Sequence, residues 1–275
     1  MAVLLSLLSA VLWGSADFGG GLMARRLPAY AVVGASQAFG LLAATMAVLA
    51  TGGVAGPRGW VVWAVLAGLA GAAALVCFYA ALATGTMGVV SPIAALGAVV
   101  PVVVSVASGE APSALAKAGV LLALLGAVAA SGPELRGGTG LRPVLLAVAA
   151  GVGFGLTLLF LAYGAEQSEV LTLWGMRLTS VTGFAVAALA ARSLVGVRVG
   201  HIPGLADVGV GDAAANLLFA LASQRGLVSI SSVLGSLYPV VTVLLAWALL
   251  GERLQRVQQV GVAAALAGVA LISLG

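Results

Sequence analysis

Long apolar stretches recur along the whole chain and constrain its fold more than any other feature. A helix needs about 20 mainly apolar residues to cross roughly 30 Å of hydrocarbon, and only short breaks separate such stretches here. Charged residues make up 7% of the 275 residues and the mean hydropathy is +1.21, whereas a soluble domain carries roughly 25% charged residues. We therefore expect an all-α, multi-pass protein of a cell membrane, surrounded by lipid bilayer and without a sizeable soluble domain.

Pro, Gly and charged residues mark the breaks and divide the chain into ten expected transmembrane helices. The expected ranges are 3–23, 28–50, 60–83, 87–108, 113–131, 143–163, 170–191, 202–222, 228–250 and 257–273.

Two blocks of the chain recur in order and indicate an internal repeat. The first block recurs 138 residues later and the second block 142 residues later. The recurring positions are Gly88, Ser91, Gly97 and Pro101 with Gly226, Ser229, Gly235 and Pro239, and then Gly109, Glu110, Gly119 and Gly126 with Gly251, Glu252, Gly261 and Gly268. Because the spacing grows by four residues, about one helical turn, the ninth helix should be one turn longer than the fourth before its Gly-Glu exit.

The internal repeat is expected to be inverted, because each repeat unit has five expected helices. An odd number of spans brings the second unit into the membrane from the opposite side, so that a pseudo-two-fold axis in the membrane plane relates the units. We therefore expect two inverted five-helix repeats, 1–135 and 140–275, with a site between them that opens alternately to each side. The alternative is a duplication retained only for helix packing.

Pro101 and Pro239 lie at equivalent places inside expected helices and predict a kink in each. Proline removes a backbone hydrogen bond within a helix, and such interruptions are tolerated in membranes where the freed groups are satisfied by neighbours or face a cavity. A cavity between kinked helices is the expected consequence.

The final third of the chain resembles a known transporter family. The run from Ser232 to Gly268, SVLGSLYPVVTVLLAWALLGERLQRVQQVGVAAALAG, resembles the closing segment of EamA-type transporters, which belong to the drug/metabolite transporter superfamily. The opening Leu12-Trp13-Gly14-Ser15 is similar to the first-helix motif of that family. The resemblance covers essentially the whole chain and implies ten helices, two EamA repeats and transport of amino acids, other small metabolites or drugs, often outward across the bacterial inner membrane. The chain departs from the family pattern at Ala16-Asp17, where uncharged residues are more usual, so the resemblance does not imply one substrate.

Asp17 is the first candidate site residue. A charge near the bilayer centre costs at least about 2.5 to 3.5 kcal/mol on insertion scales, so an ionisable residue within a span indicates function. Asp17 lies well inside the first expected helix and could bind a substrate ammonium group or exchange a proton. The alternative is a structural carboxylate, held by hydroxyl groups or by a cation such as Arg177.

Arg177 and Gln37 are candidates on the seventh and second expected helices. Arg177 resembles an arginine common in the second helix of EamA repeats, and the first repeat has Ser36 beside Gln37 at that place. Arg177 could hold a carboxylate or phosphate, or pair with Asp212, and the alternative is snorkelling to the interface. Gln37 could be a cavity donor or a hydrogen-bond donor between helices.

Asp212 and Asn216 are candidates on the eighth expected helix. They are four residues apart and share a face. The third helix, its counterpart in the repeat, offers only Gly, Ala and Cys77 in that region, and this asymmetry favours a cavity role over packing. Cys77 is the single cysteine, so an intrachain disulfide is excluded and packing is its expected role.

Four aromatic residues are candidates for lining a pathway, where they could stack against an aromatic or cationic ligand. These are Trp13, Tyr79, Trp174 and Tyr238. The alternative for each is an interfacial belt or ordinary core packing. Glu110 and Glu252, at equivalent helix exits, are expected to be caps or salt-bridge partners.

The leading functional hypothesis is secondary transport of a small amino-acid-like or amphipathic metabolite by alternating access, with the protein acting as an exporter or exchanger. Protons are the candidate coupling ion, and no cofactor or metal is expected. The chain has no GxxxxGK[ST] motif for nucleotide-driven pumping and no HExxH motif. The alternatives are an intramembrane lipid-modifying enzyme and a membrane scaffold or sensor. Nucleic acid is not an expected partner, because the basic residues behind the formal charge of +4 are scattered between apolar segments.

Two arguments on membrane orientation disagree. More arginines lie in the loops after odd-numbered helices than in the others, and the positive-inside rule therefore places both termini outside. The family resemblance places both termini inside. The orientation and the oligomeric state are left open.

Overall fold

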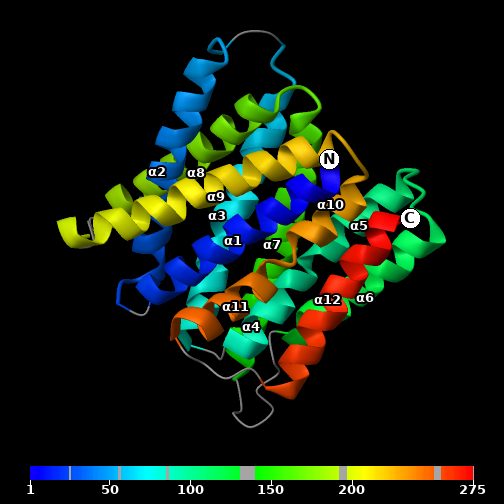
Figure 1. Cartoon of the computed structure of the whole chain (residues 1–275). Helices are drawn as coiled ribbons and strands as arrows, with labels where there is room; N and C mark the ends of the chain where they lie inside the picture. Colours follow the sequence, from blue (N-terminus) through cyan, green and yellow to red (C-terminus); the bar gives the residue numbers. More distant parts are fainter. Residues whose placement is uncertain are drawn as a thin grey trace.

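The computed structural model describes residues 1–24, 26–54, 57–84, 87–130, 140–191, 197–250 and 255–274. Within these ranges helices cover all ten predicted spans (Figure 1). Eight helical stretches of the described residues are long and apolar enough to cross a membrane, and two shorter apolar helices accompany them. The elements are α1 (Ala2–Ala24), α2 (Ala29–Ala50), α3 (Trp60–Thr84), α4 (Met87–Ala95), η1 (Leu96–Ala98), α5 (Val99–Ala107), α6 (Ala114–Ala130), α7 (Leu141–Ala165), α8 (Glu169–Ala191), η2 (Val199–His201), α9 (Ile202–Ser223), α10 (Val228–Gly235), α11 (Tyr238–Leu250) and α12 (Arg256–Leu274).

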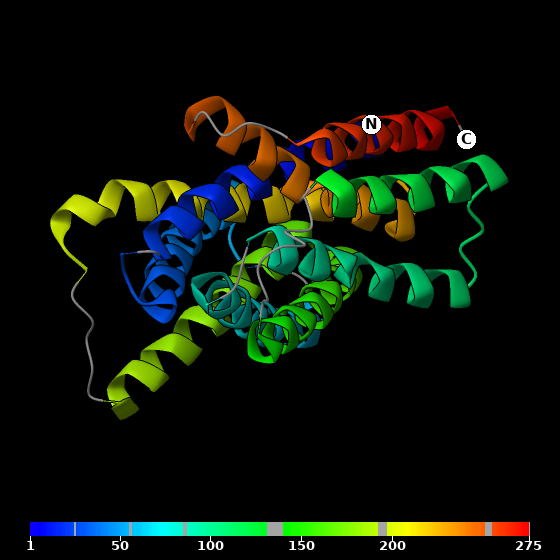
Figure 2. The ribbon, with the colours of Figure 1, turned by 90° about the horizontal axis from the view of Figure 1, so that it is seen from below.

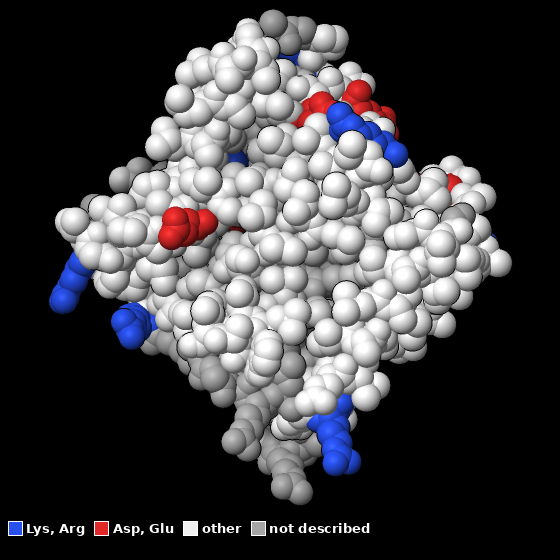
Figure 3. All heavy atoms as spheres, viewed as in Figure 1, with Lys and Arg blue, Asp and Glu red and all other residues white. Residues whose placement is uncertain are grey.

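The outer surface of the helices is apolar. Large hydrophobic side chains are exposed on several elements, among them Leu42, Leu49, Leu69, Val103, Leu121 and Leu266. Figure 3 shows charged side chains mainly around the edge of one face and a broad uncharged area between them. In water this surface would be costly, so the fold is that of an all-α membrane protein.

The fourth and ninth expected helices are each interrupted, as their prolines predict. The fourth consists of α4, the 3-10 turn η1 and α5, and the ninth consists of α10 and α11. Pro101 and Pro239 lie in the first turns of α5 and α11, where the missing N–H of proline has no helical acceptor to lose. α11 has 13 residues against 9 in α5, which agrees with the predicted additional turn.

The helices pack in pairs that involve both parts of the sequence. α3 packs against α7 and α8, while α1 packs against α9 and α2 packs against both α8 and α9. α6 and α12 lie side by side, as Figures 1 and 2 both show. The two termini lie on the same side of the molecule in both views, as an even number of spans requires.

Glycines allow α6 and α12 to approach closely. A β-carbon added at Gly119 would lie 2.8 Å from the carbonyl oxygen of Gly268, and one added at Gly126 would lie 2.8 Å from that of Gly261. In lipid, helices associate largely through close packing of this kind, because their apolar surfaces gain nothing by leaving the solvent.

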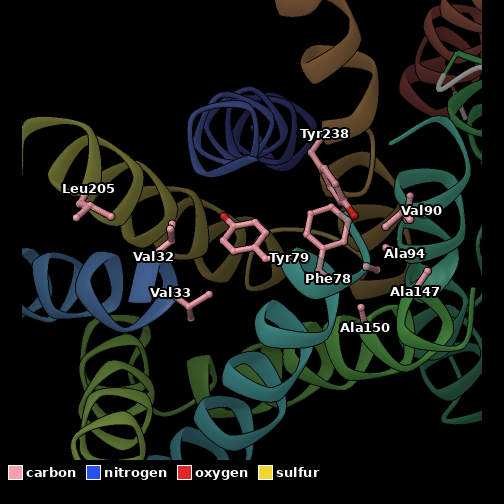
Figure 4. Packing of buried hydrophobic residues seen from close by; sticks show 12 residues of the cluster. Val32, Val33, Phe78, Tyr79, Val90, Ala94, Ala147, Ala150, Leu205 and Tyr238 are labelled. Carbon is pink, nitrogen blue, oxygen red and sulfur yellow. The ribbon is translucent and has the colours of Figure 1, made fainter. Parts of the chain in front are cut away.

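The largest apolar core joins helices from both parts of the chain. Figure 4 shows Val32 and Val33 of α2, Phe78 and Tyr79 of α3, and residues of α4, α7, α9 and α11 gathered around them. The Tyr79 hydroxyl points toward α1, where a β-carbon on Gly20 would lie 2.3 Å from it. This core holds the inner helices together beside the polar site.

Glu110 is a helix cap, as predicted for a helix exit. It follows Gly109, whose φ of 108° belongs to the left-handed region that glycine adopts without strain. Its carboxylate accepts hydrogen bonds at the start of α10. The equivalent Glu252 lies outside the described residues.

Candidate functional site

A cavity of about 80 Å³ lies among the helices, beside the breaks in α4–η1–α5 and α10–α11. Its wall brings together seven of the nine candidate residues, which are Trp13, Asp17, Gln37, Arg177, Asp212, Asn216 and Tyr238. They come from α1, α2, α8, α9 and α11, which are separated in the sequence. The cavity is therefore the candidate functional site.

A buried ion pair lies at the centre of the polar wall. Nη1 of Arg177 on α8 is 2.7 Å from Oδ2 of Asp212 on α9, and the two side chains are 3% and 17% exposed. The same guanidinium nitrogen donates to Oε1 of Gln37 on α2, while Nε2 of Gln37 donates to Oδ2 of Asp212 at 3.3 Å. Three helices therefore meet in one polar network near the middle of their lengths.

The Asp212 carboxylate has its hydrogen-bonding capacity filled. Besides Arg177 and Gln37 at Oδ2, Oδ1 accepts from Nε1 of Trp13 at 3.0 Å and from Nδ2 of Asn216 at 3.1 Å. A carboxylate offers about four lone-pair positions, and all four donors belong to the protein. Asp212 can bind a ligand only if one of these partners leaves, and in this structure its contacts join α9 to α1, α2 and α8.

Asp17 differs from Asp212 because its carboxylate is open. Asp17 is half-buried, lines the cavity and accepts no hydrogen bond from the described residues. It is close enough to Asp212 for the two carboxylates to interact electrostatically. Since the positive charge of Arg177 already faces Asp212, an ionised Asp17 would leave the cavity wall with a net negative charge.

Arg177 retains two donors without a partner. Its Nε and Nη2 atoms are buried and have no hydrogen-bond partner among the described residues. Nε faces α2, 3.5 Å from where a β-carbon on Gly40 would lie. Each unsatisfied buried donor costs about 1 to 3 kcal/mol, so a water or a ligand group that accepted from either atom would stabilise this network.

The four aromatic candidates divide into two groups. Trp13 and Tyr238 line the cavity, and the buried hydroxyl of Tyr238 has no partner among the described residues. Tyr79 and Trp174 are not among the lining residues. Tyr79 belongs to the apolar core, and Trp174 packs against Trp60 and donates to Oγ1 of Thr45 at 3.1 Å. Tyr79 and Trp174 are therefore packing residues in this structure, because the faces of α3 and α8 that carry them are turned away from the cavity.

The sequence reasoning missed three polar residues and an apolar wall. Thr157, Ser180 and Ser236 line the cavity, although their hydroxyls are used by carbonyls of their own or neighbouring helices. Ser180 could have been found, because it follows Arg177 by three residues on one helix face. The apolar wall comes from α3, α4, η1 and α7 and includes Ala67, Gly71, Leu75, Ala94, Ala98 and Phe154.

A solved structure shares this fold. One crystal structure, described only as that of a protein, superposes on this chain with a TM-score of 0.81 at 21% sequence identity. The match covers 99% of this chain and 96% of the chain in that structure. At that identity the likeness concerns the fold alone. No curated protein matches the chain.

The second part of the sequence matches a family model. Residues 141–274, which contain α7 to α12, match the model of the EamA-like transporter family. The matched segment contributes Arg177, Asp212, Asn216 and Tyr238 to the cavity wall. Over residues 141–274 the chain is therefore similar to the EamA-like transporter family.

Proposed function

We propose that this chain is a secondary transporter that moves a small amino-acid-like or amphipathic metabolite across a bacterial cell membrane, as an exporter or exchanger, by alternating access. The observation that carries the proposal is the cavity inside an apolar helix bundle, whose wall includes Asp17 and the ion pair of Arg177 with Asp212. Charged groups are costly at this depth and mark substrate or ion pathways in membrane proteins. A scaffold protein would have no need for such a chamber.

Reciprocal contacts support two inverted repeats, 1–135 and 140–275. The sequence repeat equates Gly119 with Gly261 and Gly126 with Gly268, while the contacts join Gly119 to Gly268 and Gly126 to Gly261. Exchanging the halves therefore returns the same pair of contacts, as a two-fold axis requires.

The direction of these helices supports an axis in the membrane plane. Gly119 near the start of α6 meets Gly268 near the end of α12, so the two equivalent helices are antiparallel. A two-fold axis along the membrane normal would keep equivalent helices parallel, whereas an axis in the plane reverses one of them. Halves related in this way can exchange conformations and expose the shared cavity to each side in turn.

The interrupted helices offer the moving parts for this exchange. The cavity wall includes Ala95 and Ala98 at the α4–η1–α5 break and Gly235 and Ser236 at the α10–α11 break. Broken helices beside a substrate site are the usual construction of secondary transporters. A small change of angle at either break would reshape the cavity.

Asp17 is the proposed site of proton coupling. Its open carboxylate can be ionised or protonated without breaking a hydrogen bond to the described residues. The titratable groups that interact with it electrostatically are Asp212 of α9, Tyr79 of α3 and Tyr238 of α11. Arg177 of α8 lines the same cavity and pairs with Asp212. A carrier that alternates between the two forms of Asp17 would move one proton per cycle.

Reconstitution into liposomes tests the proposal. Liposomes that contain the purified protein are loaded with a mixture of small metabolites. The time-dependent loss of each compound from the vesicles is then measured by mass spectrometry, with and without a pH gradient. Protein-dependent flux that a pH gradient changes is expected. Turnover of vesicle lipid without metabolite flux would instead identify an enzyme, and neither activity would identify a scaffold or sensor.

A further inference from the structure

The polar groups of the cavity are unequal in their availability to a ligand. Asp212 has four protein donors on its two carboxylate oxygens. The two unpaired N–H groups of Arg177 are buried, and Nε faces the backbone of α2 at Gly40. The carboxylate of Asp17 is unpaired and reaches the cavity. The carboxyl group of Asp17 is therefore the ionisable group that is open to a ligand in the cavity.

The cavity wall has two chemically different sides. Asp17, Gln37, Asp212 and Asn216 come from α1, α2 and α9, whereas α3, α4 and η1 contribute Gly, Ala and Leu side chains only. Trp13 is on the same helix as Asp17 and presents an aromatic ring beside it. Aromatic faces attract cations within about 6 Å of the ring centre. A ligand with one cationic end and one apolar end matches both sides.

The volume of the cavity restricts the size of that ligand. The cavity measures about 80 Å³, and one water occupies roughly 10 to 15 Å³ in such a measure. A cavity of roughly 150 Å³ holds benzene. The cavity is about half that size, so it can hold a ligand, or a part of a ligand, with only a few non-hydrogen atoms.

We propose that the cavity selects compact organic monocations, in which a protonated amine pairs with Asp17 and a short apolar group lies against the small side chains of α3 and α4. The proposal rests on the proposed transport function and narrows its substrate class. An amino acid is the less suitable ligand, because its carboxylate would meet Asp17 and Asp212 while the free donors of Arg177 are buried. A ligand that has a carboxylate and no cationic group is repelled from the cavity by the carboxylates of Asp17 and Asp212.

Three ligands that share one isobutyl framework test the charge preference. Isobutylamine is a cation, valine adds a carboxylate to it, and isovalerate has the carboxylate without the amine. Each is titrated into the purified full-length chain in lipid nanodiscs near neutral pH, with intrinsic tryptophan fluorescence and thermal stability as readouts. We expect isobutylamine to bind at least about tenfold more tightly than valine and isovalerate, a difference of about 1.4 kcal/mol.

Matched carboxylate variants locate the binding group. Asp17→Asn should weaken isobutylamine binding about tenfold or more, whereas Asp207→Asn should leave it unchanged, because Asp207 is exposed on α9 and does not line the cavity. Valine or isovalerate binding as tightly as the amine to the unmodified chain would overturn the proposal, as would full amine affinity in Asp17→Asn. The ligand comparison on the unmodified chain decides the matter even if Asp17→Asn does not fold.

Flux measurements separate this proposal from the proposed function. Selective amine binding without flux of any compound in liposomes would retain the ligand class and reject transport. Flux of a zwitterionic or anionic metabolite, together with an absence of amine binding, would retain transport and reject the ligand class.

Discussion

Glu110, in the turn between α5 and α6, caps the first turn of α10 through both the backbone N–H and the hydroxyl of Ser229. The distances from Oε2 of Glu110 are 3.0 Å to the Ser229 nitrogen and 2.6 Å to its Oγ, and Oε1 accepts from the nitrogen of Val228 at 2.7 Å. A carboxylate at a helix N-terminus satisfies donors that have no partner within the helix and is favoured by the helix dipole. The contact thus ties the first part of the chain to the interrupted helix that borders the cavity.

Removing this cap should lower stability and loosen α10. Glu110→Ala is expected to cost about 1.5 to 3 kcal/mol, the range for hydrogen bonds to charged groups, and Glu110→Gln should cost less because its side chain can still accept. Thermal unfolding in one detergent measures both. Glu166→Ala is the control, because Glu166 is exposed just beyond α7. A cycle with Ser229→Ala should show coupling, and strict additivity would contradict the cap.

Breaking the Arg177–Asp212 pair should be the most destabilising change in the cavity. Asp212→Asn leaves the 3% exposed Arg177 as a buried charge without its counterion, which costs about 3 to 5 kcal/mol. The double change Asp212→Asn with Arg177→Gln removes both charges and should recover part of that loss. Denaturation midpoints of the two variants and of the unmodified chain measure the effect. Equal stability of the single variant and the unmodified chain would show that the pair is not formed in the membrane protein.

Asp17→Asn should leave stability intact and remove the pH dependence of transport. Asp17 accepts no hydrogen bond from the described residues, so a neutral side chain of the same shape loses no contact and avoids the cost of a charge in a span. Flux is measured in liposomes with an imposed pH gradient, and unfolding in the same preparation. Flux that still responds fully to the gradient would remove Asp17 from the coupling mechanism.

A single methyl group at the α6–α12 contact should separate the two helices. Gly126→Ala would place its β-carbon 2.3 Å from the backbone nitrogen of Ala265, so the helices must move apart. A loss of about 1 to 3 kcal/mol is expected, as for overpacked cores. Gly183→Ala on α8 is the matched control, since a β-carbon there meets nothing within 4 Å and alanine favours the helix. Similar thermal midpoints for the two variants would contradict the close packing.

Trp174 and Trp13 should behave differently when each is replaced by phenylalanine. Trp174→Phe removes the hydrogen bond to Thr45 and should cost about 0.6 kcal/mol, a typical value between membrane helices, without changing substrate affinity. Trp13→Phe frees one lone pair of Asp212 in the cavity wall and should change ligand affinity. Ligand titration and thermal unfolding distinguish the two roles, and a large affinity change in Trp174→Phe would place that residue in the site.

The apolar segments by themselves determined the class of fold. A run of about 20 apolar residues has one stable arrangement in a bilayer, a helix, so the positions of α1, α2, α9 and α12 followed from hydropathy and from Pro and Gly. The prolines also predicted the two interruptions, because the loss of an N–H is a local property. Polar residues within spans likewise pointed to Asp17, Arg177 and Asp212, since a polar group in lipid is costly wherever the helix faces.

The rotation and neighbours of each helix were decided only by the tertiary structure. Tyr79 and Trp174 lie on helices that border the cavity yet turn their rings into packing contacts, and a sequence in which nearly every position is apolar does not show which face turns inward. The distinction between the saturated carboxylate of Asp212 and the open carboxylate of Asp17 likewise depends on donors from three other helices. Hydropathy is a property of single segments, whereas hydrogen-bond saturation is a property of their assembly, and so the sequence determined which groups enter the membrane and the structure decided which of them remain free.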